Sequence, residues 1–173
     1  MAGWFFIKSE MNGLCLDNVY GQKEEKNRVW MYPHNGTDAQ QWRFDDDGRL
    51  ENKGSSLVLD VENGNKESGT KLWMYNKNDT KAQKWKYNAE SMVLQCELNG
   101  LVLDIKDANP NPEATLQMWP ANGHAAQKWK LLPVDPAQNA AAEKAEETQA
   151  QTSEASKPKK GLFGGFGADV LGW

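Results

Sequence analysis

Three kinds of side chain that can bind a polyhydroxylated ligand recur along this chain: aspartate, tryptophan and glutamine. An aspartate closes each of three apolar-Leu-Asp motifs, at Asp17, Asp60 and Asp104, so this carboxylate returns at intervals of 43 and 44 residues. A carboxylate can accept two charge-assisted hydrogen bonds from neighbouring hydroxyls. An aromatic ring can take the apolar C–H face of a galactose-type sugar. One aspartate, one aromatic side chain and one polar amide are therefore the minimal set for a shallow sugar site.

Tryptophans follow each of these aspartates in the same order. An Ala-Gln-x-Trp motif occurs three times, again at intervals of 43 and 44 residues. Its tryptophans are Trp42, Trp85 and Trp129. Between aspartate and motif lie RVWMY, KLWMY and LQMWP, which carry Trp30, Trp73 and Trp119. A fixed period of this length indicates a repeat architecture with three units.

The elements that position these residues are predicted to be short strands. Eleven segments are rich in apolar and aromatic residues: WFFIK, LCLD, RVWMY, QWRF, LVLD, KLWMY, KWKY, MVLQC, LVLDI, LQMW and KWKLL. Turn-forming stretches such as DDDG (45–48) and NPNP (109–112) separate them. No long helical period precedes residue 136. Three units of about four strands predict an all-β, barrel-like fold with threefold pseudosymmetry.

Three Ala-Gln-x-Trp copies in phase with three Leu-Asp motifs resemble the QxW repeats of the ricin B-type (R-type) lectins, which have the β-trefoil fold. The resemblance covers about residues 4–134, and we expect the domain to span 1–135. The Gln-x-Trp triplet itself is expected to be mostly structural. Its tryptophan would be buried where the three units meet, and its glutamine amide would bind loop backbone that has no ladder partner.

The resemblance also implies three sugar sites. In the family the aspartate holds the sugar hydroxyls, the aromatic of the following x-Trp stacks on the ring, and a Gln two places before that aromatic assists. By position the implied residues are Asp17, Trp30 and Gln40 in the first unit, Asp60, Trp73 and Gln83 in the second, and Asp104, Gln117, Trp119 and Gln127 in the third. We therefore predict a lectin for galactose or N-acetylgalactosamine-type glycans with multivalent binding.

The sequence departs from the family pattern at two positions of the first and second sites and at one position of the third. The family's Asn before QxW, which also contacts the sugar, is Ala39, Ala82 and Ala126 here. Arg28 and Lys71 stand at the assisting position in the first two units, and only the third has the glutamine there. The second and third sites look the most complete, and we expect the first to be the one most easily lost. The side chains that could substitute are Asn35, Asn78 and Asn122, which lie five residues before each motif glutamine, and His124 in the third unit.

Other roles stay open for the same residues. Each aspartate could cap the turn after its strand, and Trp30, Trp73 and Trp119 could belong to the core. The alternative function is a trefoil without sugar sites, which would serve as a structural or protein-interaction subunit anchored by its C-terminal tail.

Charge and composition give no sign of catalysis or of a nucleic-acid partner. The formal net charge is −4, so there is no electrostatic reason to expect nucleic acid. Only two histidines occur, and no nucleophile–His–acid set or metal-ligand spacing can be assembled. We expect no enzyme, no cofactor and no metal.

The two cysteines, Cys15 and Cys96, do not form a disulfide framework and are expected to be buried thiols. The resemblance implies that a family disulfide partner of Cys15 would lie near Tyr32, so that bridge is absent. The N-terminus does not look like a signal peptide, and no stretch approaches the ~20 apolar residues of a membrane span. We expect a cytoplasmic protein, or one secreted without a signal peptide.

A different composition begins after residue 135. Residues 136–160 are rich in Ala, Glu, Gln, Ser and Lys and predict a flexible linker, disordered or partly helical. Residues 161–173 form an apolar tail rich in glycine and aromatic residues, for which protein contact, membrane contact and no role are all open. A homo-oligomer also stays open.

Overall fold

The structure of the protein is a computed structural model that describes residues 3–135. The strands are β1 Phe5–Ser9, β2 Cys15–Asn18, β3 Val29–Tyr32, β4 Gln41–Phe44, β5 Leu50–Asn52, β6 Val58–Val61, β7 Leu72–Tyr75, β8 Trp85–Asn88, β9 Val93–Cys96, β10 Val102–Ile105, β11 Leu116–Trp119 and β12 Trp129–Pro133. The 3-10 helices are η1 Val19–Gly21, η2 Asp38–Gln40, η3 Glu62–Gly64, η4 Lys81–Gln83, η5 Lys106–Ala108 and η6 Ala125–Gln127. Within this part of the chain, no helix is long and apolar enough to cross a membrane. The predicted linker 136–160 and tail 161–173 lie outside the described residues.

The twelve strands form three units of four, β1–β4, β5–β8 and β9–β12. Six strands close a barrel: β12 pairs with β1, β1 with β4, β4 with β5, and β8 with β9. Single backbone bonds join the remaining neighbours, from Trp85 N–H to the Gly48 carbonyl and from Trp129 N–H to the Met92 carbonyl. The other six strands pair as the hairpins β2–β3, β6–β7 and β10–β11. The predicted all-β trefoil is confirmed.

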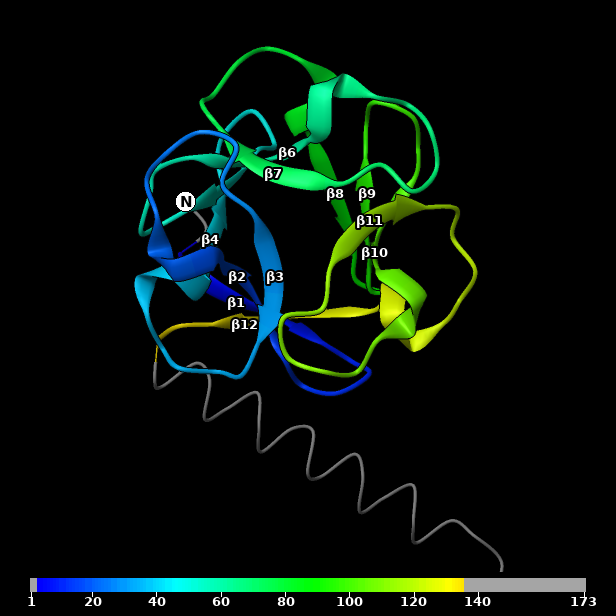
Figure 1. Cartoon of the computed structure of the whole chain (residues 1–173), viewed down its shortest axis with the longest axis horizontal. Helices are drawn as coiled ribbons and strands as arrows, with labels where there is room; N and C mark the ends of the chain where they lie inside the picture. The colour runs from blue at the N-terminus through cyan, green and yellow to red at the C-terminus, as the bar shows by residue number, and fades with distance from the viewer. Residues whose placement is uncertain (1–2, 136–173) are drawn as a thin grey trace, which may run out of the picture. The chain divides into compact units, whose positions relative to one another are not determined.

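The second strands of the three hairpins meet at the pseudo-threefold axis. Figure 1 shows β3, β7 and β11 around the middle of the molecule. Isolated bridges link them and pair Arg28 with Trp73, Trp30 with Thr115 and Lys71 with Gln117. Each unit therefore contacts both of the others through equivalent residues, and the three hairpins present equivalent surfaces in three directions.

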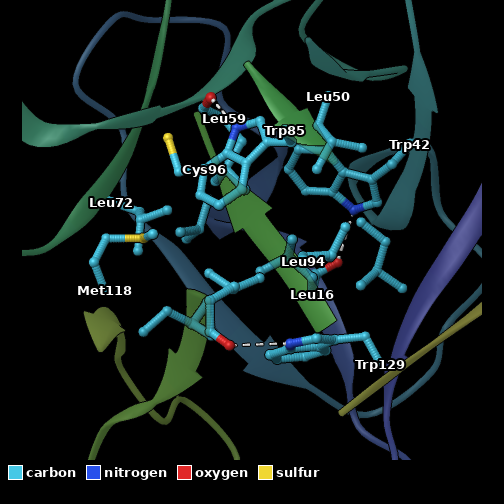
Figure 2. Close-up of a cluster of buried hydrophobic side chains, with 14 of the residues drawn as sticks. Leu16, Trp42, Leu50, Leu59, Leu72, Trp85, Leu94, Cys96, Met118 and Trp129 are labelled. Atoms are coloured by element: carbon cyan, nitrogen blue, oxygen red, sulfur yellow. Dashed lines mark hydrogen bonds between the residues drawn. The ribbon is translucent and has the colours of Figure 1, made fainter. Parts of the chain in front are cut away.

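The tryptophans of the Ala-Gln-x-Trp motifs form the centre of the core, as predicted. Trp42 and Trp129 have no exposed surface, and Trp85 is 3% exposed. Figure 2 shows their indoles among buried leucines, with dashed bonds to backbone oxygens. Each indole N–H donates to the carbonyl of the leucine just before a motif aspartate, at 3.0–3.1 Å. The core tryptophan thus ties the strand that carries the aspartate to the barrel.

Both cysteines are free and buried, as predicted. Cys15 pairs with Tyr32 across the β2–β3 hairpin, which is the position where the family resemblance placed a disulfide partner. Burial raises the pKa of each thiol to about 11. The thiols are therefore protonated at neutral pH and serve as packing groups.

Candidate functional site

The three motif aspartates occupy the same place in the three hairpins. Asp17 is the third residue of β2, and Asp60 and Asp104 are the third residues of β6 and β10. Each is only 5–6% exposed. A motif glutamine donates from Nε2 to the Oδ2 of each aspartate, at 2.7–2.8 Å. The fold thus places an oriented carboxylate at three equivalent positions.

The motif glutamines Gln40, Gln83 and Gln127 lie behind these carboxylates and have no exposed surface. The second Nε2 hydrogen of each glutamine goes to a loop carbonyl, at 2.8–2.9 Å. Each Oε1 accepts the backbone N–H of the asparagine five residues earlier, at 2.8–3.0 Å. The predicted tie to loop backbone is confirmed. With every polar atom occupied, the glutamine orients the aspartate and is shielded from a ligand.

The aspartates do not cap the turns that follow them. Their hydrogen bonds within the described residues come from side chains. The 3-10 helices η1, η3 and η5 that follow have no side-chain cap. Burial raises the pKa of all three carboxyls above the usual value, and the glutamine hydrogen bond opposes this shift. A buried carboxylate that accepts hydrogen bonds from only one or two side chains retains capacity for ligand hydroxyls.

The strand register shows that Trp30, Trp73 and Trp119 do not occupy equivalent positions in the three units, contrary to the prediction. Trp30 pairs with Asp17, and Trp73 pairs with Asp60, but the residue paired with Asp104 is Gln117. Trp119 pairs instead with Val102, two places further from the aspartate. The residues equivalent to Trp119 are therefore Tyr32 and Tyr75, which pair with Cys15 and Val58.

In the second and third units, the residue that faces the aspartate across the hairpin donates a hydrogen bond to it. Trp73 Nε1 donates to Asp60 Oδ1 at 3.0 Å, and Gln117 Nε2 donates to Asp104 Oδ1 at 3.3 Å. Trp30, at the same place in the first unit, is near enough to lower the pKa of Asp17. However, its buried Nε1 makes no hydrogen bond of acceptable geometry. Two indoles thus stand where the third unit has an amide, so Arg28 and Lys71 do not occupy the assisting position.

Tyr32, Tyr75 and Trp119 are the aromatic side chains on the solvent side of the three sites, and the sequence analysis missed the two tyrosines. Tyr32 is 37% exposed and Trp119 is 41% exposed. Tyr32 stacks on Trp30 with ring centroids 5.3 Å apart, and Tyr75 stacks on Trp73 at 5.6 Å. Strict counting would have found them, because Tyr32, Tyr75 and Trp119 keep the intervals of 43 and 44 residues, whereas Trp73 to Trp119 is 46.

Each aspartate opens into its own pocket. The first, with a volume of about 520 Å³, is lined by Asp17, Trp30 and Tyr32. The second is about 410 Å³ and contains Asp60, Trp73 and Tyr75. The third is about 380 Å³ and contains Asp104, Gln117 and Trp119. The structure therefore gathers a carboxylate and at least one aromatic ring in every unit, including the first.

The asparagines predicted as substitutes line the same pockets. Asn35, Asn78 and Asn122 each accept the N–H of the residue two places on, which forms an Asx turn. Their amide nitrogens make no hydrogen bond in the described structure, and the three side chains lie at the pocket walls. His124 lies in the third pocket, where its Nδ1 accepts the Ala126 N–H and caps η6.

The pockets combine hydrogen-bonding groups with aromatic rings. Residues 3–135 contain no group of three or more His, Cys, Asp or Glu side chains that could hold a metal ion. Each pocket offers a buried carboxylate that can accept hydrogen bonds, between one and three aromatic side chains, and an amide that can donate. This set matches a small polar molecule that has neighbouring hydroxyls and one apolar face.

Known proteins resemble this chain both in sequence and in fold. A family model described as the ricin-type beta-trefoil lectin domain matches residues 3–129. No curated protein matches the sequence. Among solved structures, the designed threefold-symmetric protein ThreeFoil is 26% identical with a TM-score of 0.71, and the match covers 75% of this chain and 98% of that chain.

Two natural lectins share the fold. The C-half of the earthworm R-type lectin, solved in complex with GalNAc, is 18% identical with a TM-score of 0.66; the match covers 75% of this chain and 98% of that one. The Rhizoctonia solani agglutinin is 22% identical with a TM-score of 0.67, over 77% of this chain and 96% of that one. The family match spans most of the described residues and includes all three pockets. The chain therefore belongs to the family of the ricin-type beta-trefoil lectin domain.

Proposed function

We propose that the protein is a lectin whose three pockets bind galactose or N-acetylgalactosamine-type glycans without catalysis. One observation carries the proposal. In each unit a buried glutamine fixes a carboxylate beside an aromatic ring in a solvent-open pocket. The motif aspartates accept hydrogen bonds from the sugar hydroxyls, and the rings of Tyr32, Tyr75 and Trp119 stack on its apolar face. The GalNAc complex of the earthworm lectin, which shares this fold, supports the ligand class.

The open pockets favour this role over that of a trefoil without sugar sites. A structural subunit has no need for a polar cavity, yet each unit keeps one of about 380 to 520 Å³. The carboxylates are also buried at an energetic disadvantage, since burial raises their pKa. Buried charge that does not strengthen the fold is expected where a ligand uses it.

The threefold arrangement compensates for shallow pockets. A single site of this kind binds with a dissociation constant of about 1 mM, or about −4 kcal/mol. Three sites that face different directions engage clustered or branched glycans together, which raises avidity without any new contact. The protein would therefore bind glycan-coated surfaces much more tightly than free monosaccharide.

Retention on immobilised galactose tests the proposal. The wild-type chain should be retained and should elute with free galactose but not with glucose. The variant Asp17→Ala/Asp60→Ala/Asp104→Ala should flow through. Asp46→Ala is the matched control, because Asp46 is an exposed aspartate outside the pockets. If the triple variant is folded by circular dichroism and is still retained, the pockets are not the galactose-binding sites. A glycan array would then identify the sugar class.

A further inference from the structure

The three pockets are not equivalent, and the first is the largest. Its volume is about 520 Å³, compared with about 410 Å³ in the second unit and 380 Å³ in the third. The carboxylate and the aromatic ring that define the monosaccharide position are common to all three. The additional space in the first unit therefore lies beyond the position that the three pockets share.

A glycine opens this space. Gly54 lies two residues after Asn52, which pairs with Trp42, and the residue in the same register of the second unit is Leu98. Leu98 lines the second pocket, whereas Gly54 lines the first. A Cβ atom at Gly54 would approach Ala39 N and Asp38 C to 3.3 Å. The first pocket is thus open where a leucine side chain narrows the second.

A tyrosine in a strained backbone conformation stands beside this opening. Tyr20 has a φ of 55°, and the equivalent residues Asn63 and Asp107 have φ values of 56° and 57°. Asparagine and aspartate tolerate this left-handed region, but a bulky side chain there is unusual and costs free energy. Nevertheless, Tyr20 is 80% exposed, and its ring lies edge-on to Trp30 with centroids 5.5 Å apart. An exposed aromatic ring held in a costly conformation at a pocket rim indicates a role in binding.

We propose that the first pocket is an extended site for a disaccharide. One sugar ring occupies the shared position between Asp17 and Tyr32, and the second ring stacks on Tyr20 above the floor that Gly54 leaves open. The second and third pockets, with Asn63 and Asp107 at the rim, take one sugar ring each. This inference rests on the proposed function, since it names the length of glycan that one of the three sites accepts.

Residue-resolved NMR titration of the whole chain tests this, because equivalent glycines report on separate pockets. Gly21 lines the first pocket and Gly64 lines the second. The probes are methyl β-galactoside and three disaccharides: lactose, melibiose and Galβ1-3GalNAc. At least one disaccharide should bind about fivefold more tightly than methyl β-galactoside when followed at Gly21, as one aromatic stacking contact would give. At Gly64 the two classes of probe should bind equally.

Two variants assign the difference. Tyr20→Asn introduces the residue type of the second unit and should abolish the disaccharide preference at Gly21, with methyl β-galactoside binding unchanged. Gly54→Leu should also abolish the preference by filling the floor, and because its Cβ would press on the backbone of Asp38 and Ala39, methyl β-galactoside binding at Gly21 is measured as its control. If the preference is the same at Gly21 and Gly64, or survives in Tyr20→Asn, the extended site is wrong and the lectin function stands. If no probe shifts either glycine, the lectin function falls and the extended site falls with it.

Discussion

Asparagine substitutions of Asp60 and Asp104 should differ in stability, because different donors face the two carboxylates. Asp60 Oδ1 accepts from the indole of Trp73, and Asp104 Oδ1 accepts from the amide of Gln117. An asparagine keeps one oxygen and replaces the other with a donor. An amide can turn over and present its own oxygen to that donor. An indole has no acceptor to offer.

The structure fixes which way the new asparagine must point. In both units the Oδ2 side faces a motif glutamine whose three hydrogen bonds prevent its amide from turning. In Asp104→Asn the asparagine NH₂ therefore faces Gln117, which turns and restores the bond. In Asp60→Asn the NH₂ faces the Trp73 N–H, so one hydrogen bond is lost and two donors oppose each other. This loss is worth about 1–2 kcal/mol.

Urea unfolding followed by tryptophan fluorescence measures the difference. With a slope of about 2 kcal/mol per molar urea, the midpoint of Asp60→Asn should lie roughly 0.5–1 M below that of Asp104→Asn, since both substitutions remove a buried charge and only the first loses a hydrogen bond. Asp104→Asn should leave the wild-type midpoint unchanged or raise it, because burial disfavours the charge that the substitution removes. Each variant should lose sugar binding at its own pocket. Equal midpoints for the two variants, or a larger loss in Asp104→Asn, would refute the assigned hydrogen-bond geometry.

Three further predictions follow from the same contacts. Acidification should release sugar while the fold persists: the pocket carboxyls have raised pKa values, so they protonate at a pH above the usual 3.8, which weakens binding. Because the folded state then holds more protons than the unfolded state, these groups add stability as the pH falls through their raised pKa values. Between pH 7 and 4, galactose-bound protein should therefore elute at a higher pH than the pH at which circular dichroism shows unfolding. Tyr75→Ala and Trp119→Ala should each weaken sugar binding at their own pocket about two- to tenfold, as loss of a stacking contact predicts, and NMR titration would contradict this if only Trp73→Ala had an effect. Cys15 and Cys96 should resist iodoacetamide in the native protein and react on denaturation, since burial raises both thiol pKa values to about 11; mass spectrometry showing rapid native labelling would contradict the packing described.

Much of the fold could be predicted from the sequence because the residues that recur in each repeat include tryptophan, which is large and infrequent. The spacing of the Ala-Gln-x-Trp copies located the three units and the buried core tryptophans. Eleven of the twelve strands coincide with the predicted segments to within a residue or so. The exception is β5, Leu50–Asn52, whose three residues include a buried Glu51 and Asn52 and therefore carry no apolar pattern.

The details of the site were harder to predict, because they depend on register and on contacts between distant segments. Because tryptophan is the most conspicuous residue type, Trp30, Trp73 and Trp119 were aligned with one another. The strand register instead gives two sets of equivalent residues, which are Trp30, Trp73 and Gln117, and Tyr32, Tyr75 and Trp119. That error lay within reach of exact counting. Counting could not have shown that Gly54 opens the first pocket, because this depends on the close approach of Ala39 from a different loop.

A crystal of the wild-type protein soaked in concentrated N-acetylgalactosamine tests the central claim most directly. The account predicts that sugar occupies at least one of the three pockets, with two neighbouring hydroxyls within hydrogen-bond distance of Asp17, Asp60 or Asp104 and the ring face on Tyr32, Tyr75 or Trp119. Sugar bound elsewhere on the trefoil, or three pockets without sugar at a concentration far above 1 mM, would contradict it.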